Sequence, residues 1–393
     1  LTAAIKLGDN AANAATATGN LNISGTANVT VAANSGNSII LGNAAVAGGT
    51  ANGTVNLTGG SLIVAGDIIR GTATGTSTAT LAVGGGTLNM SGHNLTSLTS
   101  INYTDGLISN LGVVNTGINL LGTGSRDFDQ DAAYSGTIQD AIVDSGLGVG
   151  LTKTGTGTLA LDAANTYTGD TTVSAGTLLV NGSLAADSAV TVNGGALGGT
   201  GVINGLVTVN TGGTLSPGSS LGVLTINGNL VLNAGSTNLF EVDTTVPTND
   251  VVVLGAAVTY GGVLNIVTNG TFTAGQTFTL FSGAGATTPG NFASIQGSPG
   301  AGLGFTFTNG VLSVVSTGPA YPPATLLTNS LSGSTLTLSW PINQGWRLEV
   351  QTNSLGAGLA TNWFTWPDSA STNAVSIPIN PANPTVFYRL VYP

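Results

Sequence analysis

The sequence predicts an all-β protein: a right-handed parallel β-solenoid (β-helix) followed by a small C-terminal β-sandwich. A Gly-x-Leu strand start recurs in steps of 19, 19 and 18 residues, at Gly157, Gly176, Gly195 and Gly213. Only 6% of residues are charged, yet the mean hydropathy is +0.36, so the low charge does not indicate disorder. A repeat of this period, built of strands and turns, is typical of stacked solenoid coils.

Within the repeat, short strands alternate apolar and polar residues. Val190-Thr191-Val192 and Val207-Thr208-Val209 each direct one face inward and one outward. Most of these strands end at Asn-Gly, as at Asn181-Gly182 and Asn193-Gly194, where both residue types tolerate a positive φ. Asn-Gly is also the strongest hairpin signal, so an antiparallel meander is the rival prediction. The near-constant step favours coils.

Composition excludes several classes of function. The chain of 393 residues has 16 acidic and 6 basic residues, and no cluster of Lys or Arg, so we expect no nucleic-acid binding. It has no cysteine, which excludes disulfides and thiolate metal sites. The single histidine, His93, is expected in a turn. No apolar run reaches the ~18 residues of a membrane helix, so we expect no membrane insertion.

The chain is expected to divide into four parts. Residues 1–125 form irregular solenoid coils, in which Gly60 and Gly86 begin similar strands 26 residues apart. Residues 126–315 hold the regular repeats and a wider final section, marked by phenylalanines between 271 and 312. Within them, the aspartate-rich residues 126–150 are expected to interrupt the coils as a solvated loop. About fifteen coils would give a rod of roughly 70 Å.

The C-terminal part is expected to be a separate β-sandwich. Residues 316–325 contain three prolines and predict a stiff linker. Residues 326–393 hold all four tryptophans, and strands are expected at 335–340, 346–352, 374–379 and 385–392. Trp340, Trp346 and Tyr388 are the expected core.

Residues 151–218 resemble a known family. The segment Leu151-Thr152-Lys153-Thr154-Gly155 leads to Gly157-Thr158-Leu159, and Asn165-Thr166-Tyr167-Thr168-Gly169 and Thr172-Val173-Ser174-Ala175-Gly176-Thr177-Leu178 follow. This series is similar to the passenger-associated transport repeat, also called the autotransporter-associated β-strand repeat. The resemblance implies a secreted or surface-displayed β-helical stalk of a bacterium, without catalytic residues. Less specifically, the C-terminal module resembles fibronectin-III or immunoglobulin-like domains. The chain begins at Leu1, so we expect a removed targeting segment or a start within a longer precursor.

Two candidate sites stand out. Asp127, Asp129 and Asp131 are spaced like the start of a calcium loop and predict a Ca²⁺ site, although the invariant glycine and closing glutamate of such a loop are missing. The alternative is a solvated loop in which Arg126 balances part of the charge. Trp363 and Trp366 predict an aromatic platform for a glycan, and the alternative is that both belong to the sandwich core.

These observations predict an extracellular structural protein at a bacterial cell surface and no enzyme. We expect a subunit that associates with itself, head to tail, into a fibre, because low charge and open solenoid ends favour end-to-end addition. The alternative is a monomeric adhesin stalk that presents a glycan- or protein-binding C-terminal module. A polysaccharide-active enzyme is a more remote alternative, with Asp140 and Asp144, or Glu241 and Asp243, as its carboxylates.

Overall fold

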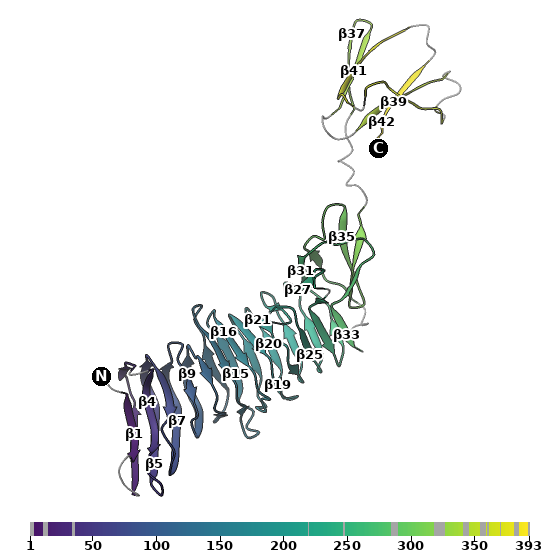
Figure 1. The fold of residues 1–393 in the computed structure, drawn as a ribbon. Helices are drawn as coiled ribbons and strands as arrows, with labels where there is room; N and C mark the ends of the chain where they lie inside the picture. The colour runs from purple at the N-terminus through teal and green to yellow at the C-terminus, as the bar shows by residue number, and fades with distance from the viewer. Residues whose placement is uncertain are drawn as a thin grey trace. The chain divides into compact units, whose positions relative to one another are not determined.

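The computed structural model describes residues 4–10, 15–33, 36–218, 220–246, 248–283, 290–317, 327–340, 346–353, 359, 361–369, 371–380 and 385–391. These residues form strands and no helix, so none of them forms a helix that could cross a membrane. The chain divides into two compact units, Leu1–Val315 and Ser316–Pro393. The first unit is a β-solenoid and the second a small antiparallel β-sandwich (Figure 1).

The solenoid is built of two long parallel sheets and a shorter third one. The first contains, in order, β1 (Ile5–Asn10), β4 (Asn37–Ala44), β6 (Asp67–Arg70), β8 (Leu95–Thr96), β10 (Val113–Val114), β13 (Ser135–Ile138), β16 (Thr158–Leu161), β18 (Thr177–Val180), β21 (Ala196–Gly198), β24 (Thr214–Leu215), β27 (Thr237–Asp243), β31 (Val263–Asn269) and β34 (Ser294–Gln296); β28 (Thr248–Asn249) pairs antiparallel with β27.

The second sheet contains β2 (Thr16–Ile23), β5 (Thr50–Val64), β7 (Thr76–Asn89), β9 (Ser100–Ser109), β12 (Ser125–Asp129), β15 (Gly150–Thr154), β17 (Thr171–Val173), β20 (Val190–Val192), β23 (Val207–Val209), β26 (Leu230–Leu232) and β30 (Val258–Thr259), with β3 (Asn28–Val31), β11 (Ile118–Leu120) and β14 (Ile142–Val143) at its side. The third contains β19 (Ser183–Leu184), β22 (Val202–Ile203), β25 (Val223–Ile226), β29 (Val251–Leu254) and β33 (Phe281–Gly283).

The repeat found in the sequence sets the register of the middle coils. Leu159 pairs with Leu178, Leu178 with Leu197, and Leu197 with Leu215, and each of these side chains is fully buried. Aliphatic side chains therefore stack directly above one another through the core, as parallel in-register strands require. The solenoid prediction is confirmed, and the antiparallel meander is wrong for this region.

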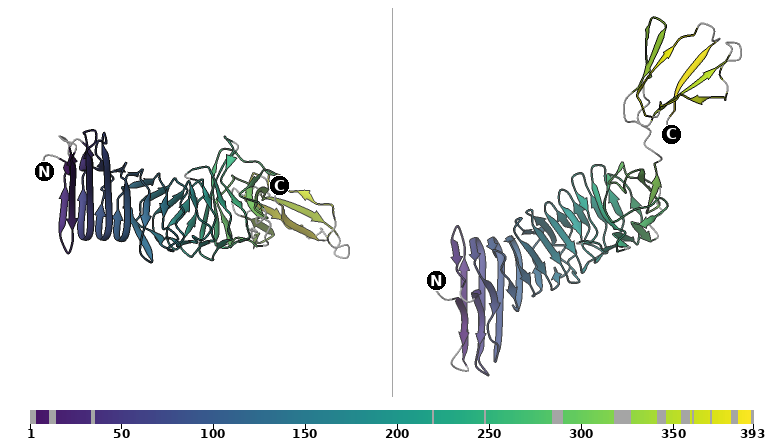
Figure 2. Two further views of the ribbon diagram at one scale, coloured as in Figure 1. Left: turned by 90° about the horizontal axis from the view of Figure 1, so that it is seen from below. Right: turned by 45° about the horizontal axis from the view of Figure 1, so that its top comes forward.

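Coil width varies along the solenoid. Paired residues of the first sheet lie 29 positions apart at Ile39 and Ile68, 19 apart at Leu159 and Leu178, and 31 apart at Leu264 and Ile295. Figures 1 and 2 show the strands shortening from the N-terminal coils to the middle.

Thirteen parallel strands form the first sheet in the described part of the chain. This is fewer than the fifteen coils expected, because the outer coils use more residues.

Residues 126–150 do not interrupt the solenoid, so that expectation is wrong. Strand β12 pairs with β9 on one side and β15 on the other, and β13 pairs with β10 and β16. The charged residues fit because outward and inward positions alternate: Arg126 and Phe128 are buried, whereas Asp127 between them is exposed.

The N-terminal coils are flat because their two sheets touch through glycine. A Cβ on Gly19 would lie 2.3 Å from the backbone nitrogen of Gly8, and one on Gly53 would lie 2.5 Å from that of Gly42. Only glycine lets two backbones approach this closely. We call these coils, strands β1 to β7, the slab.

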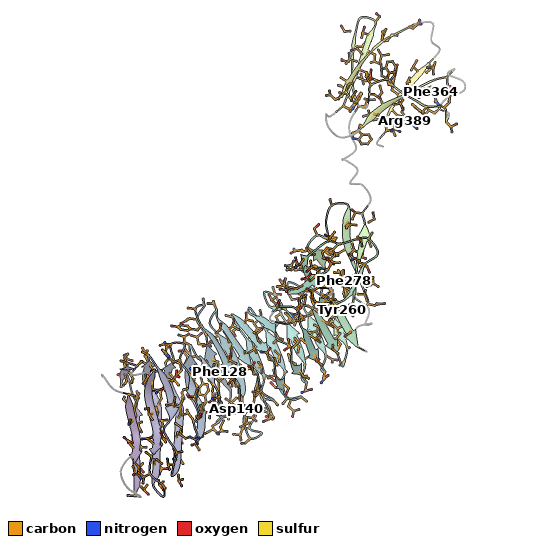
Figure 3. The ribbon with its side chains drawn as sticks, viewed as in Figure 1. Phe128, Asp140, Tyr260, Phe278, Phe364 and Arg389 are labelled. Atoms are coloured by element: carbon orange, nitrogen blue, oxygen red, sulfur yellow. The ribbon has the colours of Figure 1, made fainter. Side chains whose placement is uncertain are left out.

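The C-terminal end of the solenoid is closed by aromatic side chains. A small sheet of β32 (Thr277–Thr279), β36 (Val311–Ser316) and β35 (Leu303–Thr308), which we call the cap, packs there. Tyr260, which is labelled in Figure 3, packs against three phenylalanines. Its ring centroid lies 5.2 to 5.3 Å from those of Phe281, Phe292 and Phe307. Paired residues in these last coils lie 31 positions apart, against 19 in the middle coils.

The C-terminal unit has two three-stranded antiparallel sheets. One orders β37 (Thr328–Ser332), β38 (Thr335–Ser339) and β41 (Ala374–Pro378), and the other β40 (Phe364–Thr365), β39 (Arg347–Thr352) and β42 (Val386–Val391). Trp340 is buried with Leu338, Leu348 and Ile377, and Trp346 and Tyr388 pack against them. The expected strands and core are therefore confirmed. Most of the expected linker, 316–325, lies outside the described residues.

Candidate functional site

The expected calcium ligands lie on strand β12 and just after it. Asp127 is exposed and Asp129 half-buried on the outer face, and Asp131 follows the strand. The Asp131 carboxylate accepts a hydrogen bond of 3.0 Å from Asn110 Nδ2, and Asp129 accepts one of 3.4 Å from the Thr154 hydroxyl. Among the described residues, no group of three His, Cys, Asp or Glu side chains is placed to hold a metal ion. Calcium at these three aspartates stays a prediction, which thermal unfolding with and without calcium would test.

The alternative suggested from the sequence was a solvated loop in which Arg126 balances part of the aspartate charge. The position of Arg126 contradicts it. Arg126 is 4% exposed, and its guanidinium donates to the backbone oxygens of Tyr103 at 3.3 Å, Ser125 at 2.9 Å and Thr123 at 3.2 Å, and to that of Leu121. A buried charge is tolerated when its donors are all satisfied. Arg126 therefore fixes the corner between two strands from inside.

Lys153 is the most unusual side chain of the solenoid, and sequence analysis assigned it no role. It is fully buried, and its Nζ donates to the backbone oxygens of Gly155 at 2.9 Å and Ala175 at 3.4 Å, and to that of Thr154. Burial lowers the pKa of Lys153 to about 8, against the opposing charge of Asp129. Because no solvent reaches it, the amine acts as a corner clamp and not as a nucleophile.

The first carboxylate pair suggested for an enzyme does not form a site. Asp140 is exposed (Figure 3), while Asp144 is 1% exposed. Asp144 accepts hydrogen bonds from Gly146 and Val149 backbone nitrogens and from the backbone and hydroxyl of Thr168. Burial opposes ionisation, but these bonds overcome it and hold the pKa of Asp144 below its usual value. Asp144 thus ties one coil to the next.

The second pair lies in the wider coils near the cap. Glu241 and Asp243 line a hollow of about 200 Å³ with Ser220 and Asn269. Bonds from Thr245 and then Asn269 lower the pKa of Asp243 to about 2, so this carboxylate is already engaged. Among the described residues that line the hollow, none is an aromatic residue that could stack on a sugar.

Asp250 is a buried carboxyl behind Glu241. Its two oxygens accept from the backbone nitrogens of Gly222 at 2.8 Å and Glu241 at 2.7 Å. Burial, followed by the weaker repulsion of Glu241, raises the pKa of Asp250 to about 6. Both oxygens face the backbone, which indicates a role in shaping the turn.

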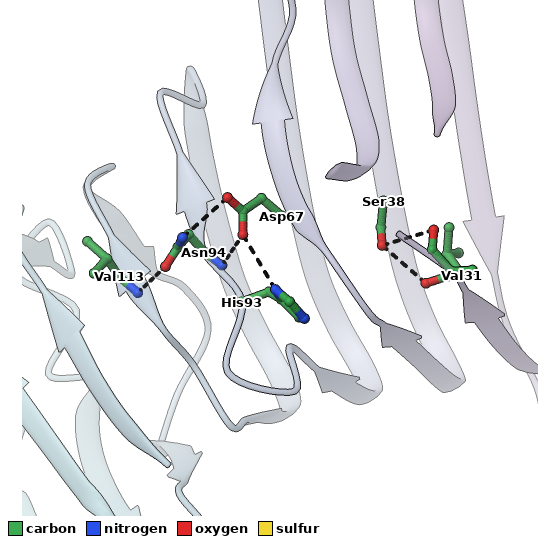
Figure 4. A network of polar contacts seen from close by, with 7 residues as sticks. Val31, Ser38, Asp67, His93, Asn94 and Val113 are labelled. Carbon is green, nitrogen blue, oxygen red and sulfur yellow. Dashed lines mark hydrogen bonds and ion pairs between the residues drawn. The ribbon is translucent and has the colours of Figure 1, made fainter. Parts of the chain in front are cut away.

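His93 lies at a corner of the early coils, where a polar network connects three turns (Figure 4). Its Nδ1 lies 3.8 Å from Asp67 Oδ1, and that carboxylate also accepts from the backbone and side chain of Asn94. Asn94 in turn accepts from the backbone of Val113 at 2.7 Å. The network continues the coil stacking, in keeping with a structural corner.

The two tryptophans expected to form a platform lie on different sides of their sheet. Trp363 is stacked under Arg389, whose guanidinium carbon is 4.2 Å from the ring centroid. Arg389 also makes two bonds, of 3.0 and 2.7 Å, to the buried Glu349. Trp366 instead packs toward the core, 6.3 Å from the Tyr388 ring. The structure does not bring the two rings together, and glycan binding there stays a prediction.

A groove of about 490 Å³ opens between the two sheets of the C-terminal unit. Leu336, Val350, Trp366, Ile377 and Tyr388 line it. Most of its lining residues are apolar, with Thr352 and Asn380 as polar members, and β41 and β42 border it as the outer strands of their sheets. The groove has the size of a small-ligand pocket.

One segment of the middle coils is similar to a known family of repeats. Residues 151–180 match the passenger-associated-transport-repeat. This segment spans β15 to β18 and includes the clamp Lys153 and the Asp144-bound Thr168. A search of curated proteins finds no match for the chain. The matched segment is similar to repeats of autotransporter passenger β-helices, domains that are generally structural and secreted or surface-associated.

Proposed function

We propose that the chain is an extracellular structural protein at a bacterial cell surface, with the solenoid as a rigid rod. The continuous core carries this proposal. The first sheet has thirteen parallel strands in the described part of the chain, and one cluster of buried hydrophobic side chains runs from Ile23 to Val314. Leucines stack in register from Leu159 to Leu215, and the buried charges Arg126, Asp144 and Lys153 all bind the backbone at corners. Twelve intervals of about 4.8 Å give a rod of roughly 58 Å.

The cap favours a single rod over a chain of rods. At the C-terminal end, Phe307 and Leu312 of the cap bury the last coils, so a further parallel coil cannot add there without displacing them. A capped solenoid end is the usual protection against edge-to-edge pairing. This supports the stalk of an adhesin, which carries the C-terminal unit and its apolar groove.

Head-to-tail assembly into a fibre is the second candidate. Among the described residues, β1 pairs only with β4, and β2 only with β5. Such edges accept strands of another chain. In the fibre, the cap of one copy would contact the first coil of the next. Such a contact joins two different surfaces and does not close into a ring, so it extends into a filament.

Electron microscopy of the purified chain, combined with antibody labelling of intact cells, tests the proposal. Separate rods of roughly 60 Å at high concentration and labelling without permeabilisation support the stalk. Filaments with a uniform axial repeat would replace it with the fibre. Labelling only after permeabilisation would contradict the surface role.

A further inference from the structure

The outer face of the slab is a regular array of uncharged polar side chains. It is formed by the outward residues of β2, β5 and β7, which alternate with buried positions along β5 and β7 and with mostly half-buried positions along β2. These residues, which we call the slab face, are Thr16, Thr18, Asn20, Asn22, Thr50, Asn52, Thr54, Asn56, Thr76, Thr78, Thr80 and Ala82.

The strand register arranges these residues in straight columns. Thr16 pairs with Thr50 and Thr50 with Thr76, and the other three columns follow in the same register. Adjacent columns are about 6.8 Å apart along the strand, and neighbours within a column about 4.8 Å apart. The slab face is therefore a rectangular grid of hydroxyl, amide and methyl groups.

Side-chain bonds and the glycine contacts keep this grid flat and fixed. The Thr78 hydroxyl donates to Asn52 Oδ1 at 2.6 Å, and Asn56 Nδ2 donates to Asn22 Oδ1 at 2.7 Å. Beneath the grid, Gly53 touches the backbone of the opposite sheet, so that the two layers cannot move apart or bulge freely. Because these bonds already order the side chains, few of them lose conformational freedom when the grid binds a rigid surface.

The opposite face of the slab has a different character. There β1, β4 and β6 carry Lys6, Asp9, Asp67 and Arg70, with Lys6 Nζ 3.7 Å from Asp9 Oδ2. The slab face carries no charge. The charged residues and the uncharged slab face therefore lie on opposite sides of the same coils.

We propose that the slab face binds ice. A charged side chain holds its own hydration shell, whereas hydroxyl and amide groups on a fixed grid can take the place of water molecules in a hydrogen-bonded lattice. The threonine methyl groups fill the spaces between them and exclude disordered water. This inference does not depend on the proposed surface role.

A second copy of the chain fits the slab face less well. Three strands by eight residues cover about 400 Å², half of the roughly 800 Å² that each partner of a stable interface buries. A glycan is also disfavoured, because the slab face has no aromatic side chain on which a sugar ring could stack. A crystalline surface needs no enclosing pocket.

Thermal hysteresis and ice-recrystallisation assays on the full chain test the proposal. We expect the wild-type chain to slow ice growth, and Thr54→Tyr, which raises a ring in the centre of the grid, to lose that activity. Thr18→Tyr, at an exposed position of the first row, should weaken it as well. Ile40→Tyr on the opposite face is the matched control and should retain wild-type activity.

Circular dichroism and analytical ultracentrifugation accompany each variant. A folded, monomeric Thr54→Tyr chain without activity supports the proposal. If Thr54→Tyr does not fold, a folded Thr18→Tyr chain with weakened activity supports it instead. A wild-type chain without effect on ice overturns it, as does equal loss in Ile40→Tyr. A wild-type dimer that Thr54→Tyr dissociates would also overturn it, because the slab face would then be a contact between copies.

Discussion

The first coils and the middle coils solve the same packing problem with different geometry. In the slab, β5 spans Thr50–Val64 in a single strand and the two sheets meet through glycine. In the middle, β17 and β20 are only three residues long, and each coil directs leucine and valine into the core between shorter faces. The slab is thus held by long ladders and close backbones, and the middle by side-chain stacking.

This difference shows that one continuous register can join two kinds of core. The pairing passes from β7 through β9 and β12 to β15 without a break in the second sheet. At the transition, the buried Arg126 and Lys153 bind backbone oxygens where the coil narrows. The two kinds of core should respond differently to the same substitutions.

The largest effect is expected where backbones touch. In Gly53→Val, the new Cβ would meet the backbone of Gly42 and Leu7 at 2.5 Å, so the two sheets of the slab must separate. We expect the free energy of unfolding to fall by about 3 kcal/mol or more. Gly84→Val is the matched control: its nearest backbone atom would be 4.0 Å away. Equal losses in chemical denaturation would show that the slab is not held by close glycine contacts.

A cavity in the middle stack should cost nearly as much. Leu178→Ala removes one fully buried side chain between Leu159 and Leu197 and should lower the free energy of unfolding by about 3 kcal/mol. Leu21→Ala, half-buried in the first coil, should cost clearly less. If both variants unfold at the same denaturant concentration, the middle stack is not more sensitive to a cavity than the first coil, contrary to this prediction.

Lys153 predicts a pH dependence that belongs to the narrowing coil. Its folded pKa of about 8 lies below the unfolded value, so the unfolded chain binds more protons above pH 8 and stability rises with pH. The gain should be about 2 kcal/mol up to about pH 10. At higher pH, burial of Tyr167, which raises its pKa to about 12, reverses the trend. Lys153→Met should abolish the rise; an unchanged pH profile in that variant would assign it to another group.

The smallest effect is expected on the solvent side of the middle coils. Asn210 links Asn193 and Asn233 by bonds of 2.8 and 2.7 Å in an outward ladder. Asn210→Ala should lower the free energy of unfolding by about 1 kcal/mol or less, because water replaces the lost bonds. Thermal unfolding measures this. A loss as large as that of Leu178→Ala would mean that surface ladders, and not the core, hold the middle coils.

The middle coils are the part of the fold that the sequence predicts most directly. There the Gly-x-Leu repeat and the coil length coincide, so Leu159, Leu178 and Leu197 could be stacked from their spacing alone. The 26-residue step between Gly60 and Gly86 likewise appears in the pairing of Leu62 with Leu88. The glycine contacts of the slab could not be predicted, because they join sheets that no local pattern connects.

The burial of Arg126 and Lys153 could not be predicted, for a physical reason. Arg126 and Lys153 look like surface residues, because a buried charge is costly unless its partners are known, and those partners are backbone oxygens that the sequence does not mark. The separation of Trp363 and Trp366 was predictable in part. Residues three apart in extended chain point to opposite sides, and the structure places them so.

The variation in strand length has a mechanical consequence. In a solenoid the backbone hydrogen bonds run along the rod axis, so a force pulling the ends apart loads the coils in series, and the coil with the fewest bonds opens first. Those are the middle coils, with ladders of two or three residues, and not the slab with its long β5 and β7. Each 19-residue coil that unwinds replaces about 4.8 Å of rod with about 65 Å of extended chain. Under tension the rod would therefore lengthen from its narrow coils, while the slab keeps its fold.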